Sequence, residues 1–282
     1  MVETAGIKHE QPLTSLAGVE RGATALWVDG TAKDLAALRD FAALETLRIY
    51  RLPRRNVPVL AGCALPRLTV LSVRHADAGD LGFLSGFVTL DTLTVWQSPK
   101  VKRLDGVERL TRLTTLAVSD IGAIESLAPL AALTGLRSLA LAGGVWNTQG
   151  LPSLAPLRAL AGLEQLNLVA AKAIDGDLGP LCDLPRLTQL LLSPRNFEPA
   201  EIARVAAVHP FFRRQLLALP DFDTWERAPG CKKCKGRRKI LFLRRKKLLW
   251  CPQCEGAKLA ALVGDFERLV EEKVRELRAG GR

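Results

Sequence analysis

The stretch IESLAPLAALTGLRSLAL, residues 124–141, decides the fold of this chain. Its apolar residues come at intervals of three from Ile124 to Leu139, and then at an interval of two, at Leu141. An interval of three predicts a 3₁₀ segment, in which side chains three residues apart nearly eclipse one another. An interval of two predicts a strand with Leu139 and Leu141 on one face. Since so short a unit cannot bury its apolar face alone, it requires neighbouring copies of itself.

Those copies are present along most of the chain. The pattern L-x-x-L-x-L, with Val or Ile variants, recurs at residues 44–49, 68–73, 90–95, 113–118, 136–141, 163–168 and 187–192, after a degenerate copy at 26–28. The central leucines lie 21, 24, 22, 23, 23, 27 and 24 residues apart. This period is typical of leucine-rich repeats, whereas a helical bundle would require a 3.6-residue period that is absent. The sequence therefore predicts an α/β solenoid, a leucine-rich repeat horseshoe of about eight repeats with a parallel sheet on its concave face.

The convex pattern L-x-x-L-x-x-L-x-x-L ahead of L-x-x-L-x-L resembles the short repeats of bacterial internalins and of the phosphatase-regulator class of leucine-rich repeat proteins. The resemblance covers roughly residues 23–192 and implies the repeat fold. The chain departs from it three residues after the last strand apolar residue, where Asn or Cys is usual. That position holds Leu52, Ala76, Ser98, Ile121, Gly144, Ala171 and Arg195. We therefore expect water or neighbouring amides to satisfy the turn backbone.

Composition and charge narrow the class of protein. Hydrophobic residues make up 48% and aromatic residues 5% of the 282 residues, which fits a solenoid core of Leu and Ala with a small appended domain. The longest apolar runs are too short to span a bilayer, and residues 1–20 lack a basic start followed by an apolar block. We therefore expect a soluble, cytoplasmic protein without a membrane partner. Residues 221–282 hold 17 Lys and Arg against nine Asp and Glu, a net +8 of the chain's +11.

The pattern divides the chain into six segments. We expect an N-terminal arm or cap at 1–22, repeats at 23–195, a helical C-terminal cap at 196–220, a linker at 221–230, a zinc ribbon at 231–256 and an amphipathic helix at 257–282. Within the cap, prolines around residues 199–208 predict one short helix, and residues 211–219 predict a second. The 27-residue interval implies an insertion at 143–150, where Gly143 and Gly144 indicate a bulged loop and Trp146 is either a contact residue or folded over a repeat edge.

Strand residues that point away from the core form the concave surface, where such solenoids usually bind partners. In the N-terminal half these positions are rich in Trp, Tyr and Arg, the residue types that dominate interface hot spots, whereas the C-terminal half is small and nearly featureless. We predict a partner-binding patch formed by Trp27, Arg48, Tyr50, Arg74, His75 and Trp96. The alternative is that large residues merely cover a wide concave sheet.

The six cysteines divide into two groups. Cys63 and Cys182 stand alone in the repeats and are predicted to be small buried apolar residues. The other four form two C-x-x-C pairs, Cys231–Cys234 and Cys251–Cys254, separated by 16 residues. This usage argues against a disulfide framework and for a reducing compartment.

Each pair is followed by x-Gly, in CKKCKG and CPQCEG, and the glycine would permit the turn that directs backbone amides toward sulfur. Residues 239–243 and 247–250 can form two strands that turn at Arg244 and Arg245. Knuckle, hairpin and knuckle together resemble a zinc ribbon. The pairs also resemble the cysteine-rich segment of DnaJ-type chaperones, but with two motifs in place of four, so chaperone function is not carried over.

We predict that Cys231, Cys234, Cys251 and Cys254 bind one structural Zn²⁺ ion with a closed tetrahedral shell. A redox dithiol is disfavoured because two pairs occur together, and the hairpin spacing does not favour an iron–sulfur site.

Ten cations and no acid lie between Cys231 and Trp250. They are Lys232, Lys233, Lys235, Arg237, Arg238, Lys239, Arg244, Arg245, Lys246 and Lys247. Zn²⁺ with four thiolates carries a formal charge of −2, which far fewer than ten cations would balance. The excess favours nucleic-acid binding through phosphates, with Trp250 and Phe242 available for stacking. A solvated hairpin, or one docked on an acidic protein, is the alternative.

Residues 257–278 carry the apolar spacing of an amphipathic helix, with acids and bases at helical pair spacings on its other face. We expect it to pack on the ribbon, whose own core is tiny, rather than to form a coiled coil. The whole pattern favours a non-enzymatic adaptor that binds a protein on its concave face. A nucleic-acid-associated regulator is the second hypothesis. The sequence shows no nucleophile–base constellation, phosphate loop or open metal site that would support an enzyme.

Overall fold

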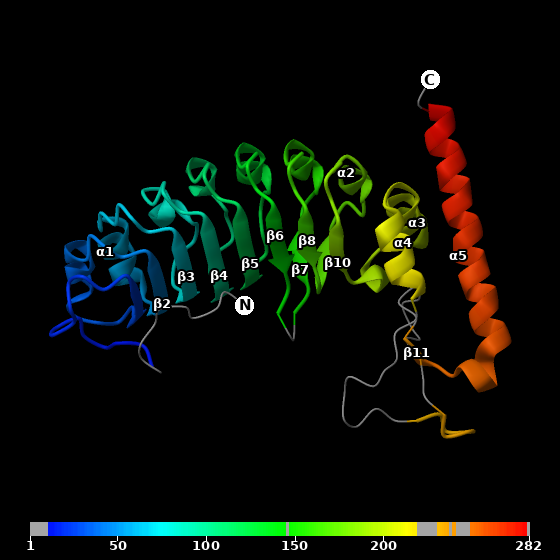
Figure 1. The fold of residues 1–282 in the computed structure, drawn as a ribbon, viewed down its shortest axis with the longest axis horizontal. Helices are drawn as coiled ribbons and strands as arrows, with labels where there is room; N and C mark the ends of the chain where they lie inside the picture. Colours follow the sequence, from blue (N-terminus) through cyan, green and yellow to red (C-terminus); the bar gives the residue numbers. More distant parts are fainter. Residues whose placement is uncertain (1–10, 145–146, 219–229, 237–238, 241–248, 281–282) are drawn as a thin grey trace.

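The structure, a computed structural model, describes residues 11–144, 147–218, 230–236, 239–240 and 249–280. The repeats form an arch whose strands pair in one eight-stranded parallel sheet (Figure 1). Its strands, in spatial order, are β1 Ala25–Asp29, β2 Thr46–Leu52, β3 Val70–Ala76, β4 Thr92–Ser98, β5 Thr115–Ile121, β6 Ser138–Ala142, β8 Gln165–Leu168 and β10 Gln189–Leu192. Each predicted L-x-L pair lies in one of these strands, which confirms the leucine-rich repeat horseshoe.

A row of leucines holds the sheet in register. Neighbouring strands pair at the central leucine of each repeat, and none of these side chains is more than 3% exposed. The row consists of Leu26, Leu47, Leu71, Leu93, Leu116, Leu139, Leu166 and Leu190. Because side chains alternate across a strand, a slip of one residue would turn a leucine outward. Full burial of one such side chain stabilises by about 1.5–3 kcal/mol, so register and stability have the same cause.

The leucines at intervals of three lie in 3₁₀ segments and two short helices along the outer edge of the arch (Figure 1). They are η1 Leu35–Asp40, η2 Arg54–Asn56, α1 Val57–Ala61, η3 Gly82–Leu84, η4 Val107–Arg109, η5 Ala128–Ala132, η6 Ala155–Ala159, α2 Gly179–Cys182 and η7 Pro194–Asn196. In the repeat quoted first, Leu127, Leu130 and Leu133 are at most 1% exposed around η5. The predicted 3₁₀ geometry is thus confirmed.

Five repeats place a non-glycine residue in the left-handed conformation, two positions after the last strand apolar residue. These residues are Arg51, His75, Gln97, Asp120 and Ala170, with φ between 50° and 55°. Such a residue costs on the order of 1–3 kcal/mol. It turns the chain so that the following residue points back into the core. Those following residues, Leu52, Ala76, Ser98, Ile121 and Ala171, are at most 4% exposed, and their burial offsets the backbone strain.

Side-chain amides at other positions form some of the hydrogen bonds to turn backbone that an asparagine ladder would form. The Nδ2 of Asn56 donates a hydrogen bond to the carbonyl oxygen of Gly30 at 2.6 Å, and the Nε2 of Gln149 donates to that of Gly122 at 2.9 Å. The Oγ of Ser98 accepts the backbone N–H of Ala76 at 2.9 Å. These contacts confirm the expectation that neighbouring polar groups satisfy the turn backbone.

The insertion in the 27-residue repeat adds a second, two-stranded sheet. Strand β7, Gln149–Leu151, pairs in parallel with β9, Ala171–Ala173. Gln149 and Leu151 are both buried, so the inserted chain returns to the core after its loop. The predicted contact residue Trp146 lies outside the described residues.

The N-terminal edge of the sheet is covered by the chain that precedes it. Leu13 forms a parallel bridge with Val28 of β1, and its backbone N–H donates to the carbonyl oxygen of Trp27 at 2.8 Å. Leu16 is completely buried in the solenoid core. The Oδ2 of Asp34 accepts hydrogen bonds from the Oγ of Ser15 and the backbone N–H of Leu16, both at 2.7 Å. Residues 11–22 therefore fasten the first strand; residues 1–10 of the predicted arm are not described.

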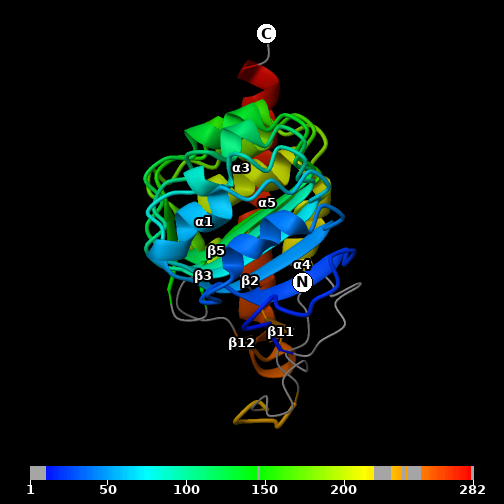
Figure 2. The same ribbon diagram turned by 90° about the vertical axis from the view of Figure 1, so that its left-hand side faces the viewer.

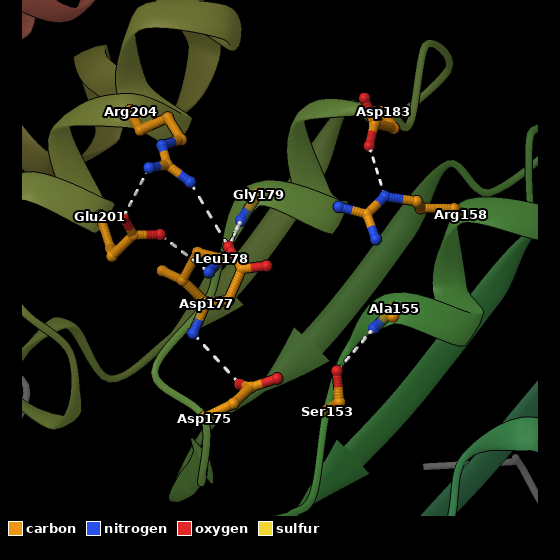
Figure 3. A network of polar contacts seen from close by, with 10 residues as sticks. All are labelled: Ser153, Ala155, Arg158, Asp175, Asp177, Leu178, Gly179, Asp183, Glu201 and Arg204. Atoms are coloured by element: carbon orange, nitrogen blue, oxygen red, sulfur yellow. Dashed lines mark hydrogen bonds and ion pairs between the residues drawn. The ribbon is translucent and has the colours of Figure 1, made fainter.

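Two helices, α3 Pro199–Val208 and α4 Pro210–Leu217, close the other end, as the sequence predicts. Polar contacts hold α3 against the last repeat (Figure 3). The Oε2 of Glu201 accepts the backbone N–H of Leu178 at 2.9 Å, and Arg204 pairs with Asp177 at 3.4 Å. Phe212 of α4 is 1% exposed and belongs to the solenoid core.

The last helix, α5, spans Pro252–Gly280 and begins five residues before the predicted start because the second cysteine pair lies in its first turns. Glu255 interrupts it with φ −131° and ψ 15°. The helix lies alongside α3 and α4 (Figures 1 and 2). No helix among the described residues combines the length and apolar character that crossing a membrane requires.

Helix α5 packs on the ribbon as expected near its beginning, and its later turns pack on the solenoid core, which the sequence did not predict. Near its beginning, Leu259 packs with Trp250 in a small separate cluster. Further along, Phe266 and Val270 are 6% and 0% exposed and join the core of the solenoid. Helix α5 therefore connects the cysteine-rich segment to the cap, and its apolar face is covered up to Val274, while Leu277 is 45% exposed.

Candidate functional site

The register of the sheet places the predicted patch residues in two rows on the concave face. One row runs through Trp27, Arg48, Ser72, Thr94, Ala117, Ala140, Asn167 and Leu191. The second runs through Asp29, Tyr50, Arg74, Trp96, Ser119 and Ala142. Trp27 and Arg48 are half-buried neighbours at the start of the first row.

Arg74 lies at the centre of a stack of aromatic and guanidinium groups. Its guanidinium carbon is 4.3 Å from the centroid of the Trp96 ring and 5.7 Å from that of Tyr50. Arg51 approaches the same Tyr50 ring at 5.0 Å, and His75 meets Tyr50 edge to face at 5.5 Å. Trp96 remains 42% exposed. The structure thus brings Tyr50, Arg74, His75 and Trp96 together, each contact of the kind worth about 0.5–1.5 kcal/mol.

Hydrogen bonds fix the orientation of this stack. The Nε of Arg74 donates to the Oε1 of Gln97 at 2.7 Å, and the Nδ1 of His75 lies 3.1 Å from the backbone oxygen of Gln97. Arg51 forms an ion pair with Asp29, which is 1% exposed. Burial raises the pKa of Asp29, but hydrogen bonds from the side chain and backbone of Thr31 and from Arg51 outweigh it and lower the pKa below 3.8.

Two residues of the stack, Arg51 and Gln97, were missed by the sequence prediction. Both occupy the left-handed position that His75 occupies in its own repeat. From this third column the prediction took His75 alone, although a repeat alignment makes the whole column visible. The column matters because the left-handed turn brings these side chains beside the second row.

The C-terminal half of the concave face is more apolar than predicted. Ala117, Ala140 and Ala142 are half-buried and leave the centre of the sheet shallow. Leu191, at the end of the first row, and Val169, directly after β8, are 48% and 44% exposed. The face is therefore cationic and aromatic at one end and aliphatic at the other.

The four cysteines of the second predicted site lie together. Their sulfur atoms are all within 4.8 Å of one another. The Sγ atoms of Cys231 and Cys254 are 3.8 Å apart, and those of Cys234 and Cys251 are 3.4 Å apart. Disulfide sulfurs would lie about 2.0 Å apart, whereas Zn–S bonds of 2.3 Å in a tetrahedron place sulfurs about 3.8 Å apart. The cluster is therefore able to hold a metal ion.

The two cysteine pairs share one backbone hydrogen bond and differ in the residue that donates it. In the first, the backbone N–H of Lys235 donates to the oxygen of Cys231 at 2.9 Å, and in the second that of Glu255 donates to the oxygen of Cys251 at 2.8 Å. Lys235 has a φ of 60°, whereas Glu255 has a φ of −131°. Gly236 of the first knuckle does not have a left-handed φ. A Cβ there would lie 3.3 Å from the Sγ of Cys234 and 2.9 Å from the Oε1 of Gln253, the far end of a flexible side chain, so a larger residue would be tight mainly against Cys234.

The second pair leads directly into helix α5, with Cys254 in the first turn and the kink at Glu255 just after it. The backbone N–H of Cys254 lies 3.4 Å from the Sγ of Cys251, as a donor toward sulfur, and Gly256 is helical with open space around it. The predicted role of the second glycine in a turn is therefore wrong, and the DnaJ-type likeness is not confirmed.

The thiols affect one another's protonation. Backbone hydrogen bonds from Cys234 and Lys233 lower the pKa of Cys231 to about 6. Hydrogen bonds with the side chain of Cys234, together with burial and the other thiols, raise the pKa of Cys254 to about 12. The four thiols are therefore coupled in their titration, and a metal ion bound there would have to displace the protons that they retain.

The structure describes the hairpin between the pairs only in part. Strand β11, Lys239–Ile240, pairs antiparallel with β12, Leu249–Trp250, so the two expected strands are present at their ends. Lys232, Lys233 and Lys235 are exposed beside the cysteines. Of the other predicted cations, Lys239 lies in β11, while Arg237, Arg238, Arg244, Arg245, Lys246 and Lys247 lie outside the described residues, as does Phe242. Trp250 is 6% exposed and packs on Leu259, so stacking on a base would require it to leave this cluster.

Comparison with known proteins finds no matching family model and no matching curated protein. Among solved structures, the chain is similar to internalin C2 of Listeria monocytogenes, with 21% identity over 61% of this chain and 74% of that one and a TM-score of 0.46. It is also similar to an internalin, InlF, of the same organism, with 20% identity, coverage of 56% and 50%, and a TM-score of 0.41. A third structure is TLR13 in complex with ssRNA13, at 16% identity, coverage of 58% and 30%, and a TM-score of 0.35. The chain spans half or less of the latter two, and the likeness concerns the fold alone.

Proposed function

We propose that this protein is a non-enzymatic adaptor of the cytoplasm that binds a protein partner on the N-terminal half of its concave face. The observation that carries the proposal is the stack of Tyr50, Arg74 and Trp96. Aromatic and arginine side chains that are already ordered lose little conformational entropy on binding, which is why they serve as interface anchors. The leucines of the same strands are buried in the core and are alike in every repeat. The residues of the two concave rows therefore distinguish one repeat from the next.

A photocrosslinking amino acid placed on each side of the molecule tests this assignment. Thr94 lies in the first concave row, whereas Val88 is 52% exposed in the turn after η3. We expect one partner to be crosslinked from position 94 and not from position 88. The substitutions Arg74→Ala and Trp96→Ala should reduce that product strongly, while Arg112→Ala, an exposed turn residue, should not. Equal crosslinking from both positions would rule out a concave binding site.

We further propose that Cys231, Cys234, Cys251 and Cys254 hold one structural Zn²⁺ ion. The sulfur separations support this metal, and four thiolates leave no position for water or substrate. The role of the site would be to fasten β11, β12 and the start of α5, since Trp250 and Leu259 make only a small cluster between them. Mass spectrometry of the folded protein under native conditions should find one zinc per chain, and much less than one after denaturation and desalting.

A second candidate function is nucleic-acid binding by the ribbon, favoured by the exposure of Lys232, Lys233 and Lys235 beside the cysteines. Deleting residues 221–282 would uncover the cap surface that Phe266 and Val270 cover, so charge reversal of these three lysines is the better test. If the ribbon binds phosphates, affinity for a single-stranded oligonucleotide should fall steeply with salt and be lost in the Lys→Glu variant. Binding that is insensitive to salt would argue against this candidate.

A further inference from the structure

We propose that the partner segment is acidic: a carboxylate cluster binds at Arg74 over β2–β4, and an aliphatic side chain of the same segment lies over Val169 and Leu191. This inference rests on the proposed concave site and adds the chemistry of its ligand. It follows from how Arg74 is held, from where the face carries charge, and from what occupies the aromatic rings.

Arg74 is prepared for a planar anion. The contact with Gln97 fixes its Nε, and the rings of Trp96 and Tyr50 lie against the guanidinium. The terminal nitrogens then form the fork that matches the two oxygens of a carboxylate. Because the guanidinium is already oriented, little additional ordering is needed when that bond forms.

The protein supplies no carboxylate for this fork within the residues that the structure describes. Gln97, a neutral group, is the side chain to which Arg74 donates. The nearest carboxylate of the same row, that of Asp29, is buried and engaged by Arg51 and Thr31. The positive charge of Arg74 is therefore left for a carboxylate of the partner to balance.

A nucleic acid fits this face less well than an acidic peptide. Base stacking requires open aromatic faces, but the Tyr50 ring is approached by Arg51, Arg74 and His75, and the Trp96 ring by Arg74. A phosphate backbone also requires a continuous line of cations. Past β4 the two rows continue instead with Ala117, Ser119, Ala140 and Ala142, without a charge.

The aliphatic end sets the length of the segment. Arg74 on β3 and Leu191 on β10 are separated by β4, β5, β6 and β8, which gives five steps between strands. At about 4.8 Å a step, the separation is roughly 24 Å. A helix of about 16 residues spans that distance, and the shallow alanine positions between the two ends leave room for it.

A displayed library of random 18-residue peptides tests the inference with the full-length protein. The library is selected on the wild-type chain after depletion on Arg74→Ala. We expect the recovered peptides to be enriched in Asp and Glu at one end and in Leu, Ile or Met at the other. A synthetic peptide of the recovered sequence should lose at least tenfold in affinity when its acids are replaced by Asn and Gln. Recovery of neutral or basic peptides, or of none, would overturn the proposal.

Three variants separate the contacts. Arg74→Lys keeps the charge but loses the stacked fork, and it should weaken the acidic peptide several-fold. Leu191→Ser should weaken it without changing its dependence on the acids. Arg112→Ala should leave affinity unchanged, and circular dichroism should show that all variants are folded. A 16-nucleotide oligothymidylate serves as the competing class: tighter binding of this probe than of the peptide, lost in Arg74→Ala, would replace the acidic peptide by a nucleic acid.

The result is distinguishable from that of the crosslinking experiment. A partner captured from position 94 whose bound segment carries no acid would leave the concave site standing and remove its acidic chemistry. Absence of crosslinking together with selection of Arg74-dependent acidic peptides would support the acidic chemistry of this face and argue against a protein partner bound there in the cell.

Discussion

The solenoid and the cysteine-rich segment solve the same problem of stability in different ways. In the solenoid, a row of leucines at most 3% exposed runs through eight strands, so each unit obtains its core from its neighbours. In the segment around β11 and β12, the described apolar core consists of Trp250 and Leu259 with Leu262 and Val263 beside them. So small a core requires another source of stability, and four sulfurs in one place provide it when a metal is bound.

The cysteines make the same contrast at the level of single groups. Burial raises the pKa of Cys182, in the last repeats, to about 11, which leaves this thiol protonated and inert. Backbone N–H groups lower the pKa of Cys231 to about 6. A cysteine among leucines is thus a small apolar residue, whereas a cysteine among amides and other cysteines forms a thiolate more readily.

The largest expected effect separates the two regions outright. Replacing both Cys231 and Cys251 by Ser should abolish metal binding and unfold the segment that contains β11 and β12. The solenoid should persist because none of its leucines depends on the metal. Hydrogen exchange measured by mass spectrometry checks this outcome, with Cys63→Ser as the matched control that retains the metal. Loss of protection throughout β1–β10 in the double variant would show that the regions are not independent.

The second prediction is made from the other side of the comparison. Leu139→Ala removes a 1% exposed side chain from the central leucine row, and it should lower the free energy of unfolding by about 2–5 kcal/mol. Urea denaturation followed by circular dichroism measures the change. The exposed Leu191→Ala serves as control, with an expected change within about 0.5 kcal/mol. Metal content should be the same in both variants.

A third prediction concerns pH. The folded-state pKa of Asp29 is lowered, so its contribution to stability is present above the ordinary pKa near 3.9 and is lost as pH falls through the lower folded-state value. Asp29→Asn should therefore cost roughly 2 kcal/mol at pH 7, because the ion pair with Arg51 is lost and the hydrogen bonds from Thr31 then reach a neutral acceptor. Urea midpoints of the two proteins should converge as pH falls through the lowered folded-state pKa of Asp29. A difference that stays constant with pH would exclude a role for the charge.

The smallest effect is expected where the two regions meet. Arg213 of α4 pairs with Glu267 of α5 at 3.2 Å, and the two side chains are 34% and 42% exposed. Arg213→Ala should cost about 0.2–1 kcal/mol, less than Phe266→Ala, which opens a cavity against the solenoid core. Thermal unfolding of both variants compares the apolar and ionic parts of this junction.

The sequence was sufficient where the structure depends on a local period. Leu127, Leu130 and Leu133 predict η5, and Leu139 with Leu141 predicts β6, because spacing alone determines which side chains share a face. It was also sufficient for the approach of the four cysteines, since C-x-x-C brings two sulfurs together whatever surrounds them.

The sequence was insufficient where a contact depends on which surfaces meet. The apolar spacing of α5 predicts a buried face but does not say that Phe266 and Val270 pack on the cap rather than on the ribbon. Arg51 and Gln97 adopt a left-handed backbone conformation although neither is glycine, so the residue type does not indicate this geometry. Pro252 was assigned to a knuckle, although proline also favours the first turn of a helix, and the second alternative holds here.

Helix α5 has one more consequence. The helix packs on the solenoid core through Phe266 and Val270 and on Trp250 through Leu259. The lysines beside the cysteines are therefore held at a fixed distance from the solenoid. Two weak contacts made by one partner, at Arg74 and at these lysines, would then reinforce each other only if the partner matches a set span. The number of repeats between Arg74 and these lysines determines that span. Inserting or removing one repeat would change the distance between the two contacts by about 4.8 Å and leave each contact itself unchanged.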